Sequence, residues 1–460
     1  MTDSSSVNQG QTEDGDGGSK RSKKKQKTGE NWRQEGPRDP FAMLDALPEK
    51  KQQEIQRALH LFSLGPSLPK TLQQAKNHTY HFWDTQPVPR LGESNVTHGP
   101  IVVGETSVRK EPFSLPQGFF WDTLDLSSPT VMTELCTLLN GNYMEEDDNT
   151  IRYDFSPDYL KWALQPPNWL VQWNCGVRVN SNNKLVGFIA AVPAEVRIYE
   201  MEKRIVQVKL LCVHKKLRLK RMTPVLIREL TRRVNQQEIY QAVYTAGIVL
   251  PTPLSSCRFW HRPLNPRKLT DVDFPGLRQN MNLQRALKFN RLPEVTKTPG
   301  LRPMTKKDVA GVRSLLQSHL CKFHLSPVFS EQEVEHWLLP RENVIDTYVV
   351  ERGDGTLTDV VSFHSTTYKV LNHPVHSGLK VAILFYIAST STDAVDLMED
   401  TLVLAKSTGF DIFSALDVMD NKSFLEKLKF SVHESSLHYY LYNWKCPNIS
   451  PDKVGLLLPN

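Results

Sequence analysis

The segment Ile205–Val234, IVQVKLLCVHKKLRLKRMTPVLIRELTRRV, joins an apolar run to a basic loop and then to an amphipathic helix. The apolar run from Val206 to Val213 predicts a buried strand. Residues 214–221 form a loop rich in Lys and Arg. Thr223 has the side chain of an N-cap, and Pro224 suits the first helical position. One apolar stripe marks the helix face that packs inward: Leu226, Ile227, Leu230 and Val234.

A basic loop between a strand and a helix N-terminus has the properties of an anion-binding site. The first N–H groups of a helix have no partner within the helix, and the helix dipole adds positive potential there. The Lys and Arg residues of the loop add full charges. An ordinary strand, loop and helix with a solvated basic face would have the same pattern, and the residues alone favour neither reading.

Several longer strings resemble the N-myristoyltransferase family. They follow one another from about Tyr80 to the C-terminus and are FWDTQPVP (82–89), LPQGFFWD (115–122), PPNWL (166–170), LVGFIAA (185–191), LCVHKKLR (211–218), YTAG (244–247), RFWHRPLNPRKL (258–269), FLEKLKF (424–430) and YYLYNWKCP (439–447). This family transfers a myristoyl group from myristoyl-CoA to the N-terminal glycine of proteins. The resemblance implies that activity, with direct attack on the thioester.

The composition agrees with a large enzyme of a reducing compartment. The chain has 460 residues, of which 39% are hydrophobic, and it has no apolar run long enough to predict a membrane span. The N-terminus lacks the apolar core of a secretory signal. The six cysteines contain no C-x-x-C pair, so neither a zinc site nor a disulfide framework is predicted. We expect a cytosolic monomer with no metal or cofactor, myristoyl-CoA being a substrate.

The first forty residues are polar and nearly free of large apolar side chains, which predicts disorder. Their basic cluster, Lys20, Arg21, Lys23, Lys24, Lys25 and Lys27, carries as many charges as the formal net charge of +6, so the remainder is balanced. This cluster is either solvated or a contact for an anionic partner, of which the ribosome is the functional expectation. A short helix is predicted at Pro48–Leu64. Residues 1–76 are assigned to this tail.

The rest divides into two similar halves, 77–240 and 241–460. In the first, strands are predicted at 175–179, 184–192, 195–199 and 204–213, then the helix from Thr223 and a strand at 242–248. In the second, strands are predicted at 346–351, 358–364 and 380–389, then a helix at 393–407 and a strand at 411–416. The repeated order predicts a duplicated α/β fold with mixed sheets and pseudo-two-fold halves. It is similar to a double acyltransferase fold whose halves are each of the GNAT type. Since only the first half has a basic loop, we expect it to bind acyl-CoA and the second half to bind the peptide.

The resemblance also implies residues for the acyl donor. The backbone N–H groups of Leu210 and Leu211 would form the oxyanion hole, where the strand bulges toward the thioester. Without the resemblance, two leucines in a strand predict only core packing. The implied acyl-CoA site consists of Tyr80, His81, Phe82, Trp83, Leu211, Cys212, Val213, Arg218, Leu219, Lys220, Arg221, Met222, Thr223 and Pro224.

A base must deprotonate the glycine amine, whose pKa is about 8. The resemblance implies the carboxylate of the chain's own C-terminus, here that of Asn460. Two features depart from the family pattern: Pro459-Asn460 adds about one residue, and Lys209 replaces a usual asparagine. A charged lysine inside the site would repel the glycine ammonium unless it points outward, and on residue type alone Lys209 is expected to be solvated at the edge of the bulge. If the terminal carboxylate is not the base, a neutral Lys209 with a depressed pKa is an alternative.

The implied acceptor site consists of Tyr143, Glu146, Asp147, Asp148, Thr245, Phe259 and His261. Its three acidic residues would contact basic residues of the peptide, or else form a solvated turn. Two alternatives remain open. Lys209 and Pro459-Asn460 suggest a paralogue that binds acyl-CoA without catalysis, and the GNAT-like pattern suggests an acyltransferase for another amine, such as lysine.

Overall fold

The computed structural model describes residues 69–93, 95–103, 108–143, 151–220, 222–274, 281–371 and 373–459. The helix predicted at Pro48–Leu64, the basic cluster of the tail and the acidic loop Glu146–Asp148 lie outside these ranges. No helix in the described ranges is long and apolar enough to cross a membrane.

The described strands form one sheet in the order β1-β3-β4-β5-β6-β14-β7-β13-β12-β11-β10-β8. Its first half contains β1 (Phe119–Thr123), β3 (Asn174–Val179), β4 (Leu185–Ile198), β5 (Met201–Val213) and β6 (Ala242–Ala246), with helix α5 (Met222–Asn235) between β5 and β6. Its second half contains β8 (Leu301–Pro303), β10 (Ile345–Glu351), β11 (Leu357–Val370), β12 (Gly378–Ser389) and β13 (Ile412–Leu416), with α10 (Ala394–Ser407) between β12 and β13.

The two halves repeat one pattern of pairing. In the first, β4 and β5 are antiparallel and β5 and β6 are parallel. In the second, β11 and β12 are antiparallel and β12 and β13 are parallel. A parallel pair needs a crossover, which α5 and α10 provide. The prediction of a duplicated α/β fold with mixed sheets is confirmed.

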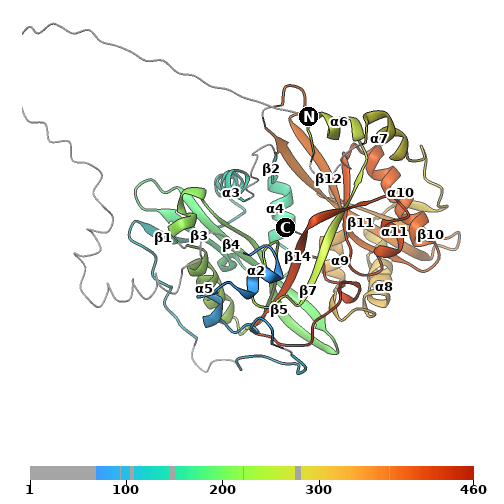
Figure 1. Cartoon of the computed structure of the whole chain (residues 1–460). Coiled ribbons are helices and arrows are strands. Elements are labelled where there is room, and N and C mark those ends of the chain that lie inside the picture. The colour runs from blue at the N-terminus through green and yellow to red at the C-terminus, as the bar shows by residue number, and fades with distance from the viewer. Residues whose placement is uncertain are drawn as a thin grey trace, which may run out of the picture. The chain divides into compact units, whose positions relative to one another are not determined.

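Two strands that the sequence analysis did not predict lie at the centre of the sheet. They are β7 (Ser255–Pro263) and β14 (Ser431–Tyr442), which pair with each other. β14 also pairs with β6 of the first half, and β7 pairs with β13 of the second. Figure 1 shows this central position between the green and the orange strands. The sheet therefore runs through both halves without a break.

The separate strand predicted at 195–199 is wrong, because β4 continues through Pro193 to Ile198. On one side of β4, the pairing with β3 stops at Ala190. The pairing with β9 (Leu325–Pro327) begins only at Val196. Pro193 lies in the gap between these two partners. A proline there costs no ladder hydrogen bond on that side, so the strand can continue.

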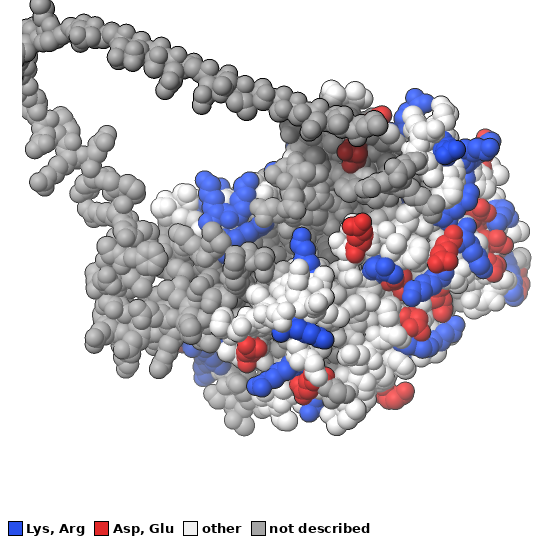
Figure 2. Space-filling model, viewed as in Figure 1, with Lys and Arg blue, Asp and Glu red and all other residues white. Residues whose placement is uncertain are grey.

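The described residues form further helices. They are α2 (Leu72–Lys76), α3 (Pro129–Asn142), α4 (Pro157–Leu164), α6 (Pro266–Asp271), α7 (Leu283–Phe289), α8 (Val309–Leu320), α9 (Glu331–Leu338) and α11 (Lys422–Leu425). Short 3-10 helices are η1 (Trp83–Thr85), η2 (Val171–Trp173), η3 (Lys215–Lys220), η4 (Lys306–Asp308) and η5 (Pro451–Lys453), and β2 (Ile151–Tyr153) pairs with β11. On the face shown in Figure 2, basic and acidic side chains are interspersed over the second half.

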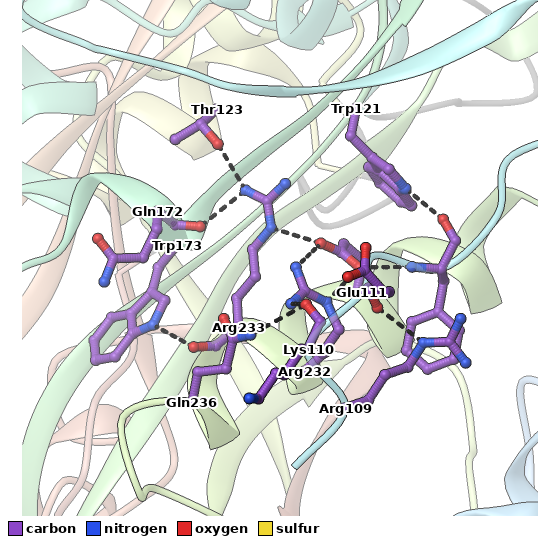
Figure 3. Close-up of polar contacts among 12 residues, drawn as sticks. Arg109, Lys110, Glu111, Trp121, Thr123, Gln172, Trp173, Arg232, Arg233 and Gln236 are labelled. Carbon is purple, nitrogen blue, oxygen red and sulfur yellow. Dashed lines mark hydrogen bonds and ion pairs between the residues drawn. The ribbon is translucent and has the colours of Figure 1, made fainter.

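A buried ion network holds the C-terminal turn of α5. Glu229 is fully buried and accepts hydrogen bonds from Arg232 at 2.6 and 2.9 Å and from Arg233 at 2.9 Å. Figure 3 shows Arg233 also donating to Thr123 of β1 and to the carbonyl of Gln172 in η2. The network therefore ties α5 to two neighbouring elements.

Candidate active site

A cavity of about 640 Å³ lies between β5, β6 and α5. The two strands pair only at Val206–Ala242 and Gln207–Val243, so the ladder between them stops there and the cavity lies beyond. Strand residues that line it are Val206, Val208, Lys209, Leu210, Leu211, Ala242, Tyr244, Thr245 and Ala246, and Gly247 and Ile248 follow directly after β6. Helix α5 contributes Thr223, Pro224, Ile227, Leu230, Thr231, Val234 and Asn235. The volume is typical of a small-molecule site.

β5 bulges beside this cavity. Phe188 of β4 lies opposite Cys212, and Ala190 lies opposite Lys209, so Leu210 and Leu211 together face one β4 residue, Ile189. Leu210 has φ of 50°, in the left-handed region that leucine rarely adopts. A bulge takes backbone groups out of the ladder. The bulge that the family resemblance implied here is confirmed by this register shift.

An aromatic cluster forms the cavity wall next to β6. Trp83 stacks on Tyr244 with ring centroids 5.8 Å apart, and Phe82 also lines the cavity. Tyr80 is buried and donates its hydroxyl to the carbonyl of Val249 at 2.7 Å. Burial raises the pKa of Tyr80 to about 12. His81 is half-buried in the turn between these rings. The structure thus brings Phe82 and Trp83 to the cavity and uses Tyr80 to fix the segment.

The predicted basic loop is the 3-10 helix η3. The Arg218 guanidinium donates to the carbonyl of Asn142 at 2.5 Å, and the N–H of Lys215 donates to the Asn142 side chain at 3.0 Å. These bonds hold η3 against the end of α3. The side chains of Leu219 and Lys220, and all of Arg221, lie outside the described part of the chain.

The prediction that Thr223 is the N-cap of the helix is wrong. α5 already begins at Met222, so Thr223 and Pro224 lie in its first turn. Proline is tolerated there because the first helical N–H groups have no helical acceptor. Thr223 and Pro224 both line the cavity, as the anion-site reading of this turn requires.

Three of the implied acyl-CoA residues belong to the core instead of the cavity lining. Cys212, Val213 and Met222 are all buried among apolar side chains. Cys212 follows the cavity residue Leu211 directly, and successive residues of a strand point to opposite faces. Burial raises the pKa of the Cys212 thiol to about 12, which keeps it protonated near neutral pH.

Some of the implied acceptor residues line the cavity and others do not. Tyr143, at the end of α3, and Thr245 of β6 both line the cavity. Phe259 and His261 lie on β7 and are not part of its lining. His261 Nδ1 is 2.7 Å from the Ser414 hydroxyl, and burial, aided by nearby His433, lowers the pKa of His261 to about 4. Glu146, Asp147 and Asp148 lie outside the described ranges.

The expectation that Lys209 is solvated is wrong. Its side chain is 1% exposed, lines the cavity and donates from Nζ to the carbonyl of Pro459 at 2.5 Å. Burial lowers the pKa of Lys209 to about 7. The penultimate residue of the chain thus reaches the bulge from the other end of the sequence. Asn460, the implied base, lies outside the described residues.

The sequence analysis missed one side of the cavity. The prediction that Ile227, Leu230 and Val234 form an inward-facing apolar stripe is confirmed, since Leu230 and Val234 are buried in the core. These residues also line the cavity, together with Thr231 and Asn235. Thr231 and Asn235, which lie four residues apart within that stripe, were the signal in the sequence that could have indicated a cavity there. Periodicity shows which helix face points inward, but it does not show whether that face meets side chains or a cavity.

Comparison with known proteins identifies the family. Residues 102–257 match the N-terminal domain and residues 271–456 the C-terminal domain of myristoyl-CoA:protein N-myristoyltransferase. Glycylpeptide N-tetradecanoyltransferase 2 of Danio rerio is 59% identical over 90% of this chain and 84% of its own length. The Bos taurus protein of the same name is 55% identical over 91% and 84%. A structure of Saccharomyces cerevisiae N-myristoyltransferase with bound myristoyl-CoA has 37% identity and a TM-score of 0.78, covering 82% of this chain and 96% of that one. This chain therefore belongs to the myristoyl-CoA:protein N-myristoyltransferase family.

Proposed function

We propose that this chain transfers the myristoyl group of myristoyl-CoA to the N-terminal glycine amine of proteins. The observation that carries this proposal is the cavity, which joins a β-bulge, the first turn of α5 and an apolar helix face. The yeast relative binds myristoyl-CoA, and the curated relatives are glycylpeptide N-tetradecanoyltransferases. The chain is accordingly an acyltransferase of this family.

The glycine nitrogen attacks the thioester carbonyl directly, without an acyl-enzyme. A C–N bond forms, the C–S bond breaks, and the CoA thiolate leaves and takes up a proton. The backbone N–H groups of Leu210 and Leu211 stabilise the oxyanion, because the bulge removes this part of β5 from the ladder. The terminal carboxylate of Asn460 accepts the proton of the amine. Tyr143 and Thr245 position the glycine.

The acyl chain lies along the inner face of α5. From Ile227 to Asn235 this face extends for about 12 Å, and the lining residues Leu230 and Val234 are apolar. Each methylene removed from water contributes about 0.8 kcal/mol. An apolar cavity of this kind favours a long acyl group over the acetyl group of an ordinary N-acetyltransferase.

The CoA phosphates bind at η3 and the first turn of α5, where Arg218, Lys220 and Arg221 supply charge. Phe82 and Trp83 contact the remainder of CoA from the other side. In this proposal residues 77–240 hold the acyl donor. Residues 241–460, including Phe259 and His261, hold the acceptor, with help from the acidic loop Glu146–Asp148.

One assay separates this proposal from its two alternatives. Myristoyl-CoA is given a peptide with an N-terminal glycine, the same peptide with an acetylated N-terminus, and an acetylated peptide containing lysine. Product from the first peptide alone supports the glycine transferase. Product from the third indicates lysine acylation, and saturable binding of myristoyl-CoA without any product indicates a non-catalytic paralogue.

The donor site gives the first prediction. Arg218→Glu with Lys220→Glu should weaken myristoyl-CoA binding by at least about tenfold, because charge-assisted bonds to phosphate become repulsive. Isothermal titration calorimetry measures the affinity, which should also fall with salt in the unmodified chain. The control variant reverses the charge of two exposed lysines in the second half, by Lys406→Glu with Lys427→Glu. Equal affinities for the two double variants would place the phosphates elsewhere.

Chain-length selectivity gives the second prediction. Thr231→Phe adds a ring where the half-buried threonine lines the cavity. We expect the ratio of transfer from myristoyl-CoA to transfer from decanoyl-CoA to fall at least about tenfold, because several methylenes lose their apolar surroundings. Thr133→Phe, at an exposed position of α3, is the control. An unchanged ratio would mean that the acyl chain does not lie along α5.

The tail gives the third prediction. We propose a cytosolic monomer whose basic cluster contacts the ribosome. Deleting residues 1–40 should leave transfer to a free peptide nearly unchanged and reduce co-sedimentation with ribosomes at low salt, where charge is least screened. A variant that keeps the tail but replaces the six basic residues with glutamine should behave like the deletion. Undiminished co-sedimentation of both variants would refute the contact.

A further inference from the structure

The last residues of the chain are buried and held by backbone hydrogen bonds as far as Leu457. The N–H of Gly455 donates to the carbonyl of Leu325 at 2.7 Å, and the N–H of Leu457 donates to the Tyr386 hydroxyl at 3.3 Å. A Cβ on Gly455 would lie 2.8 Å from the Phe323 ring, so the close passage requires glycine. This segment therefore has a defined path into the protein.

Beyond Leu457 the hydrogen bonding changes. Pro459 has no N–H, so its backbone can only accept. Its carbonyl accepts from Lys209 Nζ at 2.5 Å, across 250 positions of sequence. Pro459 is itself buried. The contact joins the penultimate residue to the strand position that precedes the bulge.

Lys209 has no acidic side chain within ion-pair distance among the described residues. Its neighbours there include the Trp337 ring, whose centroid is 6.0 Å from Nζ, and His364 of β11. Burial and the charge of Lys209 lower the pKa of His364 to about 3, so this histidine is neutral near pH 7. A buried ammonium without a counter-charge is costly. The Pro459 carbonyl is the hydrogen-bond partner that the structure gives to Lys209 Nζ.

We infer that Lys209 is a positioning residue that anchors the C-terminal segment of the chain at the wall of the active cavity through the carbonyl of Pro459. The inference rests on the proposed function, since the anchored carboxylate is the base of that reaction. Because Lys209 lines the cavity and directly precedes the bulge, the anchor joins the C-terminal segment to a residue of the cavity wall. Without this hydrogen bond Pro459 loses its only polar contact with the described residues.

The test compares Lys209→Met, which keeps the length and apolar stem but removes the donor, with Lys184→Met at an exposed turn. The rate of amide hydrogen exchange over residues 454–458 measures how firmly the C-terminal segment is held, independently of catalytic activity. We expect exchange there to accelerate at least about tenfold in Lys209→Met, with no change elsewhere and none in Lys184→Met. Unchanged exchange in Lys209→Met overturns the inference.

A second readout excludes a merely structural role. In the anchored enzyme, a short glycine extension after Asn460 displaces the carboxylate. In Lys209→Met the end is already released, so the same extension should lower the single-turnover rate by less than about threefold, and the two changes should be non-additive. Lys209→Gln, which keeps an N–H donor, should recover part of the rate. Full additivity with no recovery would show that Lys209 acts elsewhere.

Two further outcomes keep the test decisive. If Lys209→Met does not fold, deleting Pro459 and Asn460 removes the same hydrogen bond from the other partner, and exchange over 454–458 must accelerate as before. Slow exchange in that deletion contradicts the anchor. If the unmodified chain transfers myristate to no glycine peptide, the proposed function fails, while hydrogen exchange still decides whether Lys209 holds the chain end.

Discussion

Adding a short glycine extension after Asn460 should lower the single-turnover rate of transfer to a glycine peptide by roughly 10²–10⁴-fold, the usual contribution of a general base. Pro459 is buried and its carbonyl is bonded to Lys209, so added residues must either displace this end or move the carboxylate away from it. Rapid-quench measurement with saturating myristoyl-CoA separates this step from product release.

The matched control carries the same extension at the N-terminus, within the part of the chain expected to be disordered. It should react at the unmodified rate, and both proteins should bind myristoyl-CoA equally. A C-terminally extended enzyme that reacts as fast as the control would show that the terminal carboxylate is not the base. Lys209 would then be the first alternative, because burial brings the pKa of its amine to about 7, close to the optimum for a base at neutral pH.

The second large effect is on stability. Glu229→Ala should lower the free energy of unfolding by about 3–5 kcal/mol, because it leaves the buried guanidinium groups of Arg232 and Arg233 without their shared carboxylate. Equilibrium urea unfolding measures the change. Glu426→Ala, at an exposed position, is the control and should change the free energy by less than about 0.5 kcal/mol. A loss below about 1 kcal/mol in Glu229→Ala would mean that the network is not coupled to folding.

The same network predicts a pH dependence. Burial alone raises the pKa of Glu229, but hydrogen bonds from Arg232, Arg233 and the N–H of Phe113 outweigh it and leave this pKa below its usual value. A carboxyl whose pKa is lower in the folded protein stabilises it above the unfolded pKa. That stability is lost as pH falls through the folded pKa. When the pH is lowered, the free energy of unfolding should therefore fall more in the unmodified protein than in the Glu229→Ala variant.

Local pattern was sufficient for much of the fold. The strands and helix of the second half were predicted within a few residues at 346–351, 380–389 and 393–407, because alternation and helical periodicity are short-range signals. β7 and β14 were missed, and in both strands exposed and half-buried residues interrupt the regular alternation of buried positions. Their strand character comes from pairing with distant segments.

The sequence by itself determined the duplicated order of strands and helices, the family, and the cavity residues Leu210, Leu211, Thr223 and Thr245, which lie within or a few residues from strings that resemble the family. Only the tertiary structure decided the environment of Lys209. As a residue type it predicts a solvated side chain, yet the end of the chain and α9 cover it. Its hydrogen bond to Pro459 spans 250 positions. Burial and a depressed pKa depend on which distant segments exclude water from a side chain, and no local pattern contains that information.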